Sequence, residues 1–85
     1  MSSFLNVILY IIFSMKNVIE IFAERLSELR KESNLSLMQL GKDLGVSDTA
    51  LSRWERGVQI PNIETLVIIA KYFNVSTDYL VGLED

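Results

Sequence analysis

The sequence predicts an all-α fold, a compact bundle of five short helices with an apolar N-terminal extension. Three observations support this prediction: apolar residues recur at helical spacing between residues 19 and 81, no segment shows the strict alternation of a half-buried strand, and Ser, Asn and Gly residues separate the periodic stretches. A chain of 85 residues has room for one domain with one small core.

The first predicted helix covers about residues 19–32. Phe22, Leu26 and Leu29 follow the spacing i, i+4, i+7 and would share one face, while charged residues occupy the other faces. We expect the helix to end near Ser33 and Asn34, which are poor helix formers ahead of a new helix start.

Two short helices joined by a tight turn follow, over about residues 37–44 and 48–56. Ser36 and Gln39 have the spacing of a capping box, in which the hydroxyl accepts a hydrogen bond from a first-turn N–H and the glutamine reaches back. Gly45 suits the positive φ after a helix end, and Ser47 is the next N-cap candidate. Small residues at Gly41 and Gly45 allow the close crossing of a helix-turn-helix, with a generic corner between two helices as the alternative. The expected inward residues are Leu40, Leu44, Ala50, Leu51 and Trp54.

The last two predicted helices cover residues 63–73 and 77–81. Pro61 precedes the first of them, Asn74 ends it, and Ser76 is an N-cap candidate for the second. Ile68 lies opposite the expected inward stripe and should be exposed. That stripe consists of Ile63, Leu66, Val67, Ala70 and Phe73.

The composition excludes several kinds of chemistry. The chain has no Cys and no His, which removes disulfides, thiolate zinc sites, Ser-His dyads and histidine-based metal sites. We therefore expect neither an enzyme nor a bound cofactor, and we expect no small-molecule ligand. The net charge of −3 and the pI of about 4.8 argue against a nucleic-acid partner on average. Such a partner would have to meet one locally basic face, because contacts depend on how charge is distributed.

Four stretches between residues 22 and 82 resemble the Cro/phage-repressor class of helix-turn-helix proteins, often called the XRE-like family. They read FAERLSELRKE, LSLMQLGKDLGVSDTALSRWERG, IPNIETL and AKYFNVSTDYLVG. The resemblance covers about 60 of the 85 residues and keeps the order and spacing of all five helices. It implies a lambda-repressor-like DNA-binding domain whose third helix enters the major groove of double-stranded DNA.

The resemblance assigns the base contacts to the outward face of the third helix, at Asp48, Thr49, Ser52 and Arg53. Arg53 can donate two hydrogen bonds to guanine O6 and N7, and Thr49 offers a hydroxyl and a methyl group. Asp48 only accepts, so cytosine N4 is its natural base partner. For each residue the alternative is a solvated helix surface.

Phosphate contacts are expected around the N-termini of the second and third helices, whose first N–H groups are free to bind anions. This selects Ser36, Leu37 through its backbone, and Ser47. The flanking candidates, for which a solvated surface residue is the alternative, are Gln39, Lys42, Arg56 and Asn62.

Three departures from the family pattern weaken the expected DNA contact. The family often has Gln at the position of Leu37 and basic residues at the positions of Val58 and Gln59. Fewer cations release fewer counterions, so binding per half-site should be weak, with a shallow salt dependence. Asp48 adds repulsion from nearby phosphate. A helix-turn-helix domain used for protein contact, with a vestigial DNA face, is therefore the alternative from another functional class.

The resemblance also implies an internal ion pair. The family commonly joins an arginine of the first helix to a glutamate at the end of the recognition helix, and Arg30 and Glu55 match these positions. We expect a buried pair, with two solvated surface charges as the alternative.

Residues 1–15 form an apolar extension without a charged side chain, and residues 16–85 form the predicted DNA-binding domain. The apolar run from Phe4 to Phe13 is much shorter than the roughly 20 residues of a membrane span. A longer span would bury Lys16 and Glu20, so we do not expect a membrane partner.

Three interpretations of the extension stay open. In the first, Met15 is the native start and residues 1–14 lie upstream of it. In the second, the segment is a helix or a β-arm that packs on the domain or on a partner. In the third, it tethers the chain weakly to a membrane.

The predicted function is sequence-specific DNA binding by a cytoplasmic transcriptional regulator, a repressor that binds an inverted-repeat operator as a homodimer. The alternatives are an antitoxin that also represses its own operon, and the protein-interaction module. The resemblance implies that the dimer contact uses the last helix and nearby surface. We expect the extension to add to this contact or to cover Ile68.

Overall fold

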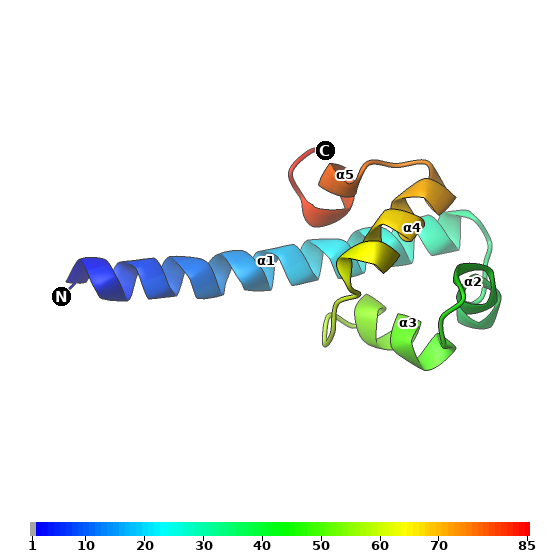
Figure 1. The fold of residues 1–85 in the computed structure, drawn as a ribbon, viewed down its shortest axis with the longest axis horizontal. Helices are drawn as coiled ribbons and strands as arrows, with labels where there is room; N and C mark the ends of the chain where they lie inside the picture. The colour runs from blue at the N-terminus through cyan, green and yellow to red at the C-terminus, as the bar shows by residue number, and fades with distance from the viewer. Residues whose placement is uncertain (1) are drawn as a thin grey trace.

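The computed structural model describes residues 2–85, which form five helices and no strand (Figure 1). This confirms the predicted all-α bundle. The helices α2 to α5 gather around the C-terminal half of a long first helix, while the N-terminal half of that helix projects away from them. Their bounds are α1 Ser2–Glu32, α2 Leu37–Leu44, α3 Asp48–Glu55, α4 Ile63–Phe73 and α5 Thr77–Val81.

The core lies where the five helices meet. Each helix contributes one of the largest fully buried side chains to it, and together these bury enough apolar surface to dominate the stability of so small a domain. These five residues are Leu26, Leu40, Leu51, Ile69 and Leu80.

Local capping chemistry fixes where the short helices begin and end. The hydroxyl of Ser36 accepts a hydrogen bond from the backbone N–H of Gln39, and that of Ser47 accepts one from Ala50, each at 3.0 Å. Gly45 has a φ of 75° after α2, as its position predicts. One detail is wrong: the Gln39 side chain does not reach back to the cap but donates to Asp43 at 2.8 Å, because that carboxylate lies one turn ahead on the same face.

The predicted inward stripe of α4 is partly wrong. Ile63 and Val67, both expected to point inward, are 81% and 37% exposed, whereas Ile69, which the stripe omitted, is fully buried. The helix is apolar on several faces, so its sequence permits two stripes, and packing against α2 and α5 selects the one at i, i+3, i+4, i+7 that begins at Leu66. Ile68 is exposed, as predicted.

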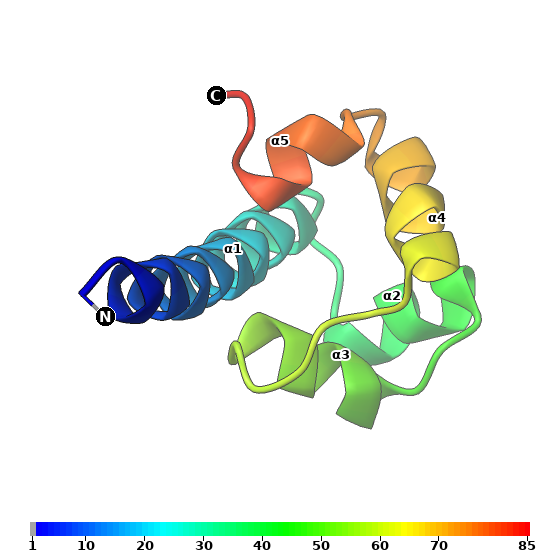
Figure 2. The same ribbon diagram turned by 60° about the vertical axis from the view of Figure 1, so that its left-hand side comes forward.

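The helix α1 continues without interruption from the apolar extension into the core. Residues 3–13 are all exposed and project from the bundle as a single helix (Figures 1 and 2). Among residues 2–85 the extension therefore has no β form, does not pack on its own domain and does not cover Ile68. By length and composition Ser3–Glu32 would suffice to cross a membrane, a test that signal sequences and the core helices of soluble proteins also pass.

Candidate nucleic-acid interface

The helices α2 and α3 cross closely because a glycine lies at their contact. A Cβ atom on Gly41 would lie 2.7 Å from the carbonyl oxygen of Val46, which is closer than such atoms approach. The backbone N–H of Val46 in turn donates to the Gly41 carbonyl at 2.8 Å. The short turn between the helices therefore depends on the missing side chain at residue 41.

The buried side of α3 determines which of its residues face solvent. Leu51 and Trp54 are buried in the core, and Asp48, Thr49 and Arg53 are exposed on the opposite side. In both ribbon views α3 and α5 lie on opposite sides of α1, so the exposed face of α3 is on the outside of the bundle. Three of the four residues selected for base contact thus share one accessible surface.

Ser52, the fourth of these residues, is only partly exposed and has a neighbour of its own. Its hydroxyl accepts a hydrogen bond from Nε of Arg56 at 3.3 Å. This contact joins a base-contact candidate to a phosphate-contact candidate one turn later.

The phosphate-contact candidates other than Arg56 fall into two groups. Ser36 and Ser47 are exposed and cap their helices, Leu37 packs against the core so that only its backbone is available, and Lys42 is exposed. Gln39 and Asn62 instead have intramolecular partners: the first donates to Asp43, and the second caps α4 by accepting from the Thr65 N–H at 2.8 Å.

A polar contact that the sequence did not predict fixes α2 against α4. The Tyr72 hydroxyl donates to one carboxylate oxygen of Asp43 at 2.7 Å, and the Gln39 amide donates to the other. This hydrogen bond raises the pKa of Tyr72 above its ordinary value. Asp43 and Tyr72 are 29 residues apart, so no local pattern pointed to the pair.

Arg30 and Glu55 form a bidentate ion pair between α1 and the end of α3. Nε of Arg30 lies 2.6 Å from Oε2 of Glu55, and Nη2 lies 3.0 Å from Oε1. The remaining Nη1 donates to the Leu35 carbonyl at 2.8 Å. The side chains are only 15% and 10% exposed, and the hydrogen bond to Glu55 raises the pKa of Arg30. One guanidinium thus holds α1, the loop after it and α3 together.

A second arginine, also not predicted, fastens the C-terminal residues to α1. Nη1 of Arg25 donates to the carbonyl oxygens of Tyr79 and Glu84, the latter at 2.6 Å, and the guanidinium lies 4.3 Å from the centre of the Tyr79 ring. The partners are more than 50 residues away in the sequence, which is why spacing gave no sign of them.

Comparisons with known proteins agree with this geometry. A sequence profile of the helix-turn-helix family matches residues 26–80. The chain is 45% identical over 64 residues to the HTH-type transcriptional activator BcrR of Enterococcus faecalis, covering 75% of this chain and 31% of that protein. It is 39% identical over 62 residues to repressor protein C2 of Salmonella phage P22, covering 73% and 29%.

The similarity to the P22 repressor extends from the sequence to the fold. The P22 c2 repressor, crystallised in complex with a synthetic operator, superimposes with a TM-score of 0.70 at 38% identity, covering 74% of this chain and 96% of that one. The chain spans about a third of the length of the curated relatives named above. The family match reaches from Leu26 in α1 to Leu80 in α5 and contains the whole α2–α3 unit. The chain therefore belongs to the helix-turn-helix family.

Proposed function

We propose that the chain is a cytoplasmic transcriptional regulator that binds double-stranded DNA by placing α3 in the major groove. The observation that carries this proposal is the division of α3 into a side anchored in the core by Leu51 and Trp54 and an exposed side with Asp48, Thr49 and Arg53. The relationship to the P22 repressor, which was crystallised with an operator, supports it.

Each exposed residue has a distinct task in the proposed contact. Arg53 reads guanine through O6 and N7, Thr49 meets a base with its hydroxyl or methyl group, and Asp48 accepts from cytosine N4. Ser52 takes part through the side of its hydroxyl not used by Arg56. These contacts carry sequence information, since they involve base edges.

The backbone phosphates meet the N-termini of α2 and α3. The first-turn N–H groups that follow the exposed caps Ser36 and Ser47 are the expected donors to phosphate, and the exposed Lys42 and Arg56 add positive charge. Gln39 and Asn62 contact phosphate only through the donor capacity left by their internal hydrogen bonds. With so few cations, one domain binds weakly, and a homodimer on an inverted repeat raises the effective affinity.

Selection of bound sequences from a random DNA pool at two salt concentrations tests the function. We expect a converged palindrome, with recovery falling at the higher salt concentration because phosphate contacts release counterions. Absence of enrichment at both concentrations would contradict DNA reading and favour a protein-interaction module.

Substitutions on and beside α3 separate base reading from phosphate contact. Arg53→Ala should weaken binding to the selected site by roughly 1–3 kcal/mol and relax the preference at one base pair. Arg56→Ala should weaken binding to all sequences alike and lower the slope of log affinity against log salt by about one.

Titrations of cognate and scrambled duplexes at several salt concentrations measure both effects. Arg56→Lys is the matched control, because it keeps the charge but loses the Nε hydrogen bond to Ser52. If the two alanine variants altered specificity equally, the assignment of the α3 faces would be wrong.

A further inference from the structure

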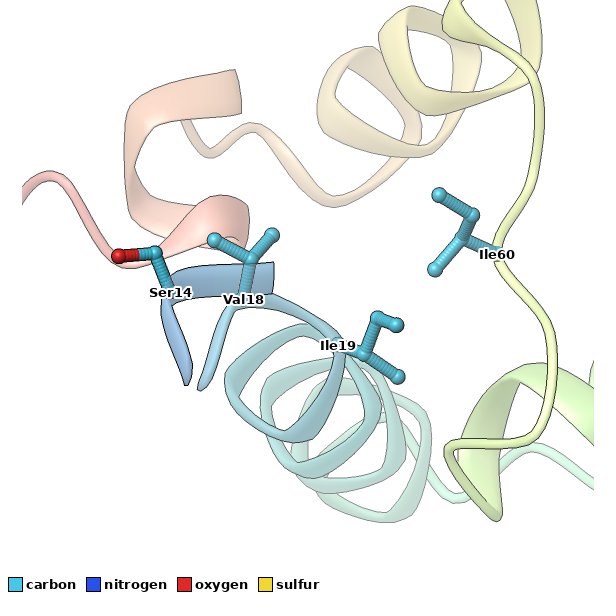
Figure 3. A pocket seen from close by; sticks show the side chains of 4 residues that line it. All are labelled: Ser14, Val18, Ile19 and Ile60. Carbon is cyan, nitrogen blue, oxygen red and sulfur yellow. The ribbon is translucent and has the colours of Figure 1, made fainter. Parts of the chain in front are cut away.

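An apolar groove runs beside α1 at the point where this helix leaves the bundle. Figure 3 shows Ile60 of the α3–α4 connection reaching toward α1, and a hollow of about 190 Å³ is lined by Ser14, Val18, Ile19 and Ile60. A second hollow shares Val18 and Ile60 and extends this groove to Phe22 and Val81. Val18 and Ile60 are 39% and 50% exposed, so apolar surface is open to solvent there.

The exposed helix of residues 3–13, here called the arm, is apolar on every side. Successive residues of a helix are about 100° apart, and the run from Phe4 to Phe13 is interrupted only by Asn6, so no polar stripe exists. Phe4, Tyr10 and Phe13 are all more than 65% exposed. A helix that is hydrophobic all round is stable only when it is covered on several sides, and the arm is not covered by its own chain.

We propose that the arm of each copy lies in the apolar groove of a second copy, in a two-fold dimer whose α1 helices run antiparallel and cross near Ser14. The lengths agree: at 1.5 Å per residue, Phe4–Phe13 spans about 14 Å and the groove from Ser14 to Phe22 about 12 Å. In this register Phe13 meets the partner's Ser14, and Leu9 meets the partner's Val18. The arm and the groove belong to the same chain, so the contact is self-complementary, as two-fold symmetry requires.

A lipid bilayer fits the arm less well than a second copy does. The uncharged residues 1–15 would form about 23 Å of helix, short of the roughly 30 Å hydrocarbon core. A bilayer would also leave the apolar groove open to water. The partner's arm covers both surfaces at once.

The proposed dimer also suits the DNA contact on which the proposed function rests. Gly57, just after α3, lies beside Ile19 and Ala23, and Glu55 is paired with Arg30, so the end of α3 meets α1 between about 8 and 24 Å beyond Ser14. Two-fold symmetry doubles this to between about 15 and 48 Å along α1, a range that contains the roughly 34 Å turn that separates half-sites in DNA.

Sedimentation of the full-length chain without DNA tests the groove. Ile60→Glu should raise the dimer dissociation constant at least tenfold, because a carboxylate in the groove would be desolvated by the partner's arm. Val58→Glu, on the same connection but outside the groove and already 64% exposed, is the matched control and should leave the constant unchanged. A monomeric wild type, or equal effects of the two variants, would overturn the proposal.

Cysteine cross-linking tests the crossing point, since the chain has no cysteine of its own. Ser14→Cys should oxidise to a covalent dimer at least tenfold faster than Ser33→Cys, placed in the exposed turn at the other end of α1. Equal rates of cross-linking for the two cysteine variants would overturn the antiparallel arrangement. If monomers float with phosphatidylcholine vesicles, and do so only when the arm is present, the arm binds lipid instead of a second copy. Neither measurement involves DNA. A negative result would therefore contradict the proposed dimer and leave the proposed DNA binding to its own test.

Discussion

Glu55→Ala should lower the free energy of unfolding by about 3 kcal/mol, close to the low end of what removing one partner of a buried ion pair costs. The substitution leaves the Arg30 guanidinium largely desolvated, with the Leu35 carbonyl as its remaining hydrogen-bond partner. The end of α3 also loses its ion pair with α1. Urea unfolding followed by circular dichroism measures the effect.

Glu28→Ala is the matched control for this prediction. Glu28 lies on the exposed side of α1, and surface substitutions of this kind change stability by less than about 0.5 kcal/mol. If Glu55→Ala cost less than about 1 kcal/mol, the pair would behave as a solvent-screened surface pair despite its bidentate geometry.

Gly41→Ala should destabilise the domain by about 2 kcal/mol, the magnitude expected when a well-packed contact is overfilled. Helix propensity alone predicts the opposite sign, because alanine is favoured over glycine inside a helix by about 1 kcal/mol. The steric effect prevails because the new Cβ meets the Val46 carbonyl, which is backbone and cannot rotate away. The α2–α3 turn has to open, so cognate DNA affinity should fall even at a temperature where the variant is fully folded.

Gly45→Ala separates crowding from backbone strain in the same turn. A Cβ at this position meets open space, but the φ of 75° disfavours any L side chain by roughly 1–2 kcal/mol. This variant should lose stability but keep DNA affinity, since nothing pushes the two helices apart. If the Gly41→Ala variant were as stable as the wild type, the prediction would be wrong, because the turn would then move away from the new Cβ atom without any loss of folding free energy.

The helix boundaries were predictable because each depends on a few neighbouring residues. Ser36 and Ser47 cap helices through bonds to residues three positions later, and Gly45 takes a φ that other residues avoid. The inward face of α4 was not predictable in the same way, since Ile63 and Ile69 are equally apolar and only tertiary packing distinguishes them.

The candidate interface shows the same division between local and long-range information. The exposed face of α3 follows from the spacing of Leu51 and Trp54. The Asp43–Tyr72 hydrogen bond and the hydrogen bonds from Arg25 to the C-terminal residues instead join residues far apart in the sequence. The composition changes near residue 15, and α1 is nevertheless continuous across this position because no helix breaker stands there.

Trp54 is the single tryptophan of the chain, and it lies on the buried side of α3. Indole fluorescence therefore comes from one known place in the molecule. Its emission wavelength reports whether α3 is docked against the core, while DNA on the opposite face leaves the indole in apolar surroundings. The domain thus carries an intrinsic optical probe that distinguishes undocking of this helix from loss of DNA contact, without any added label.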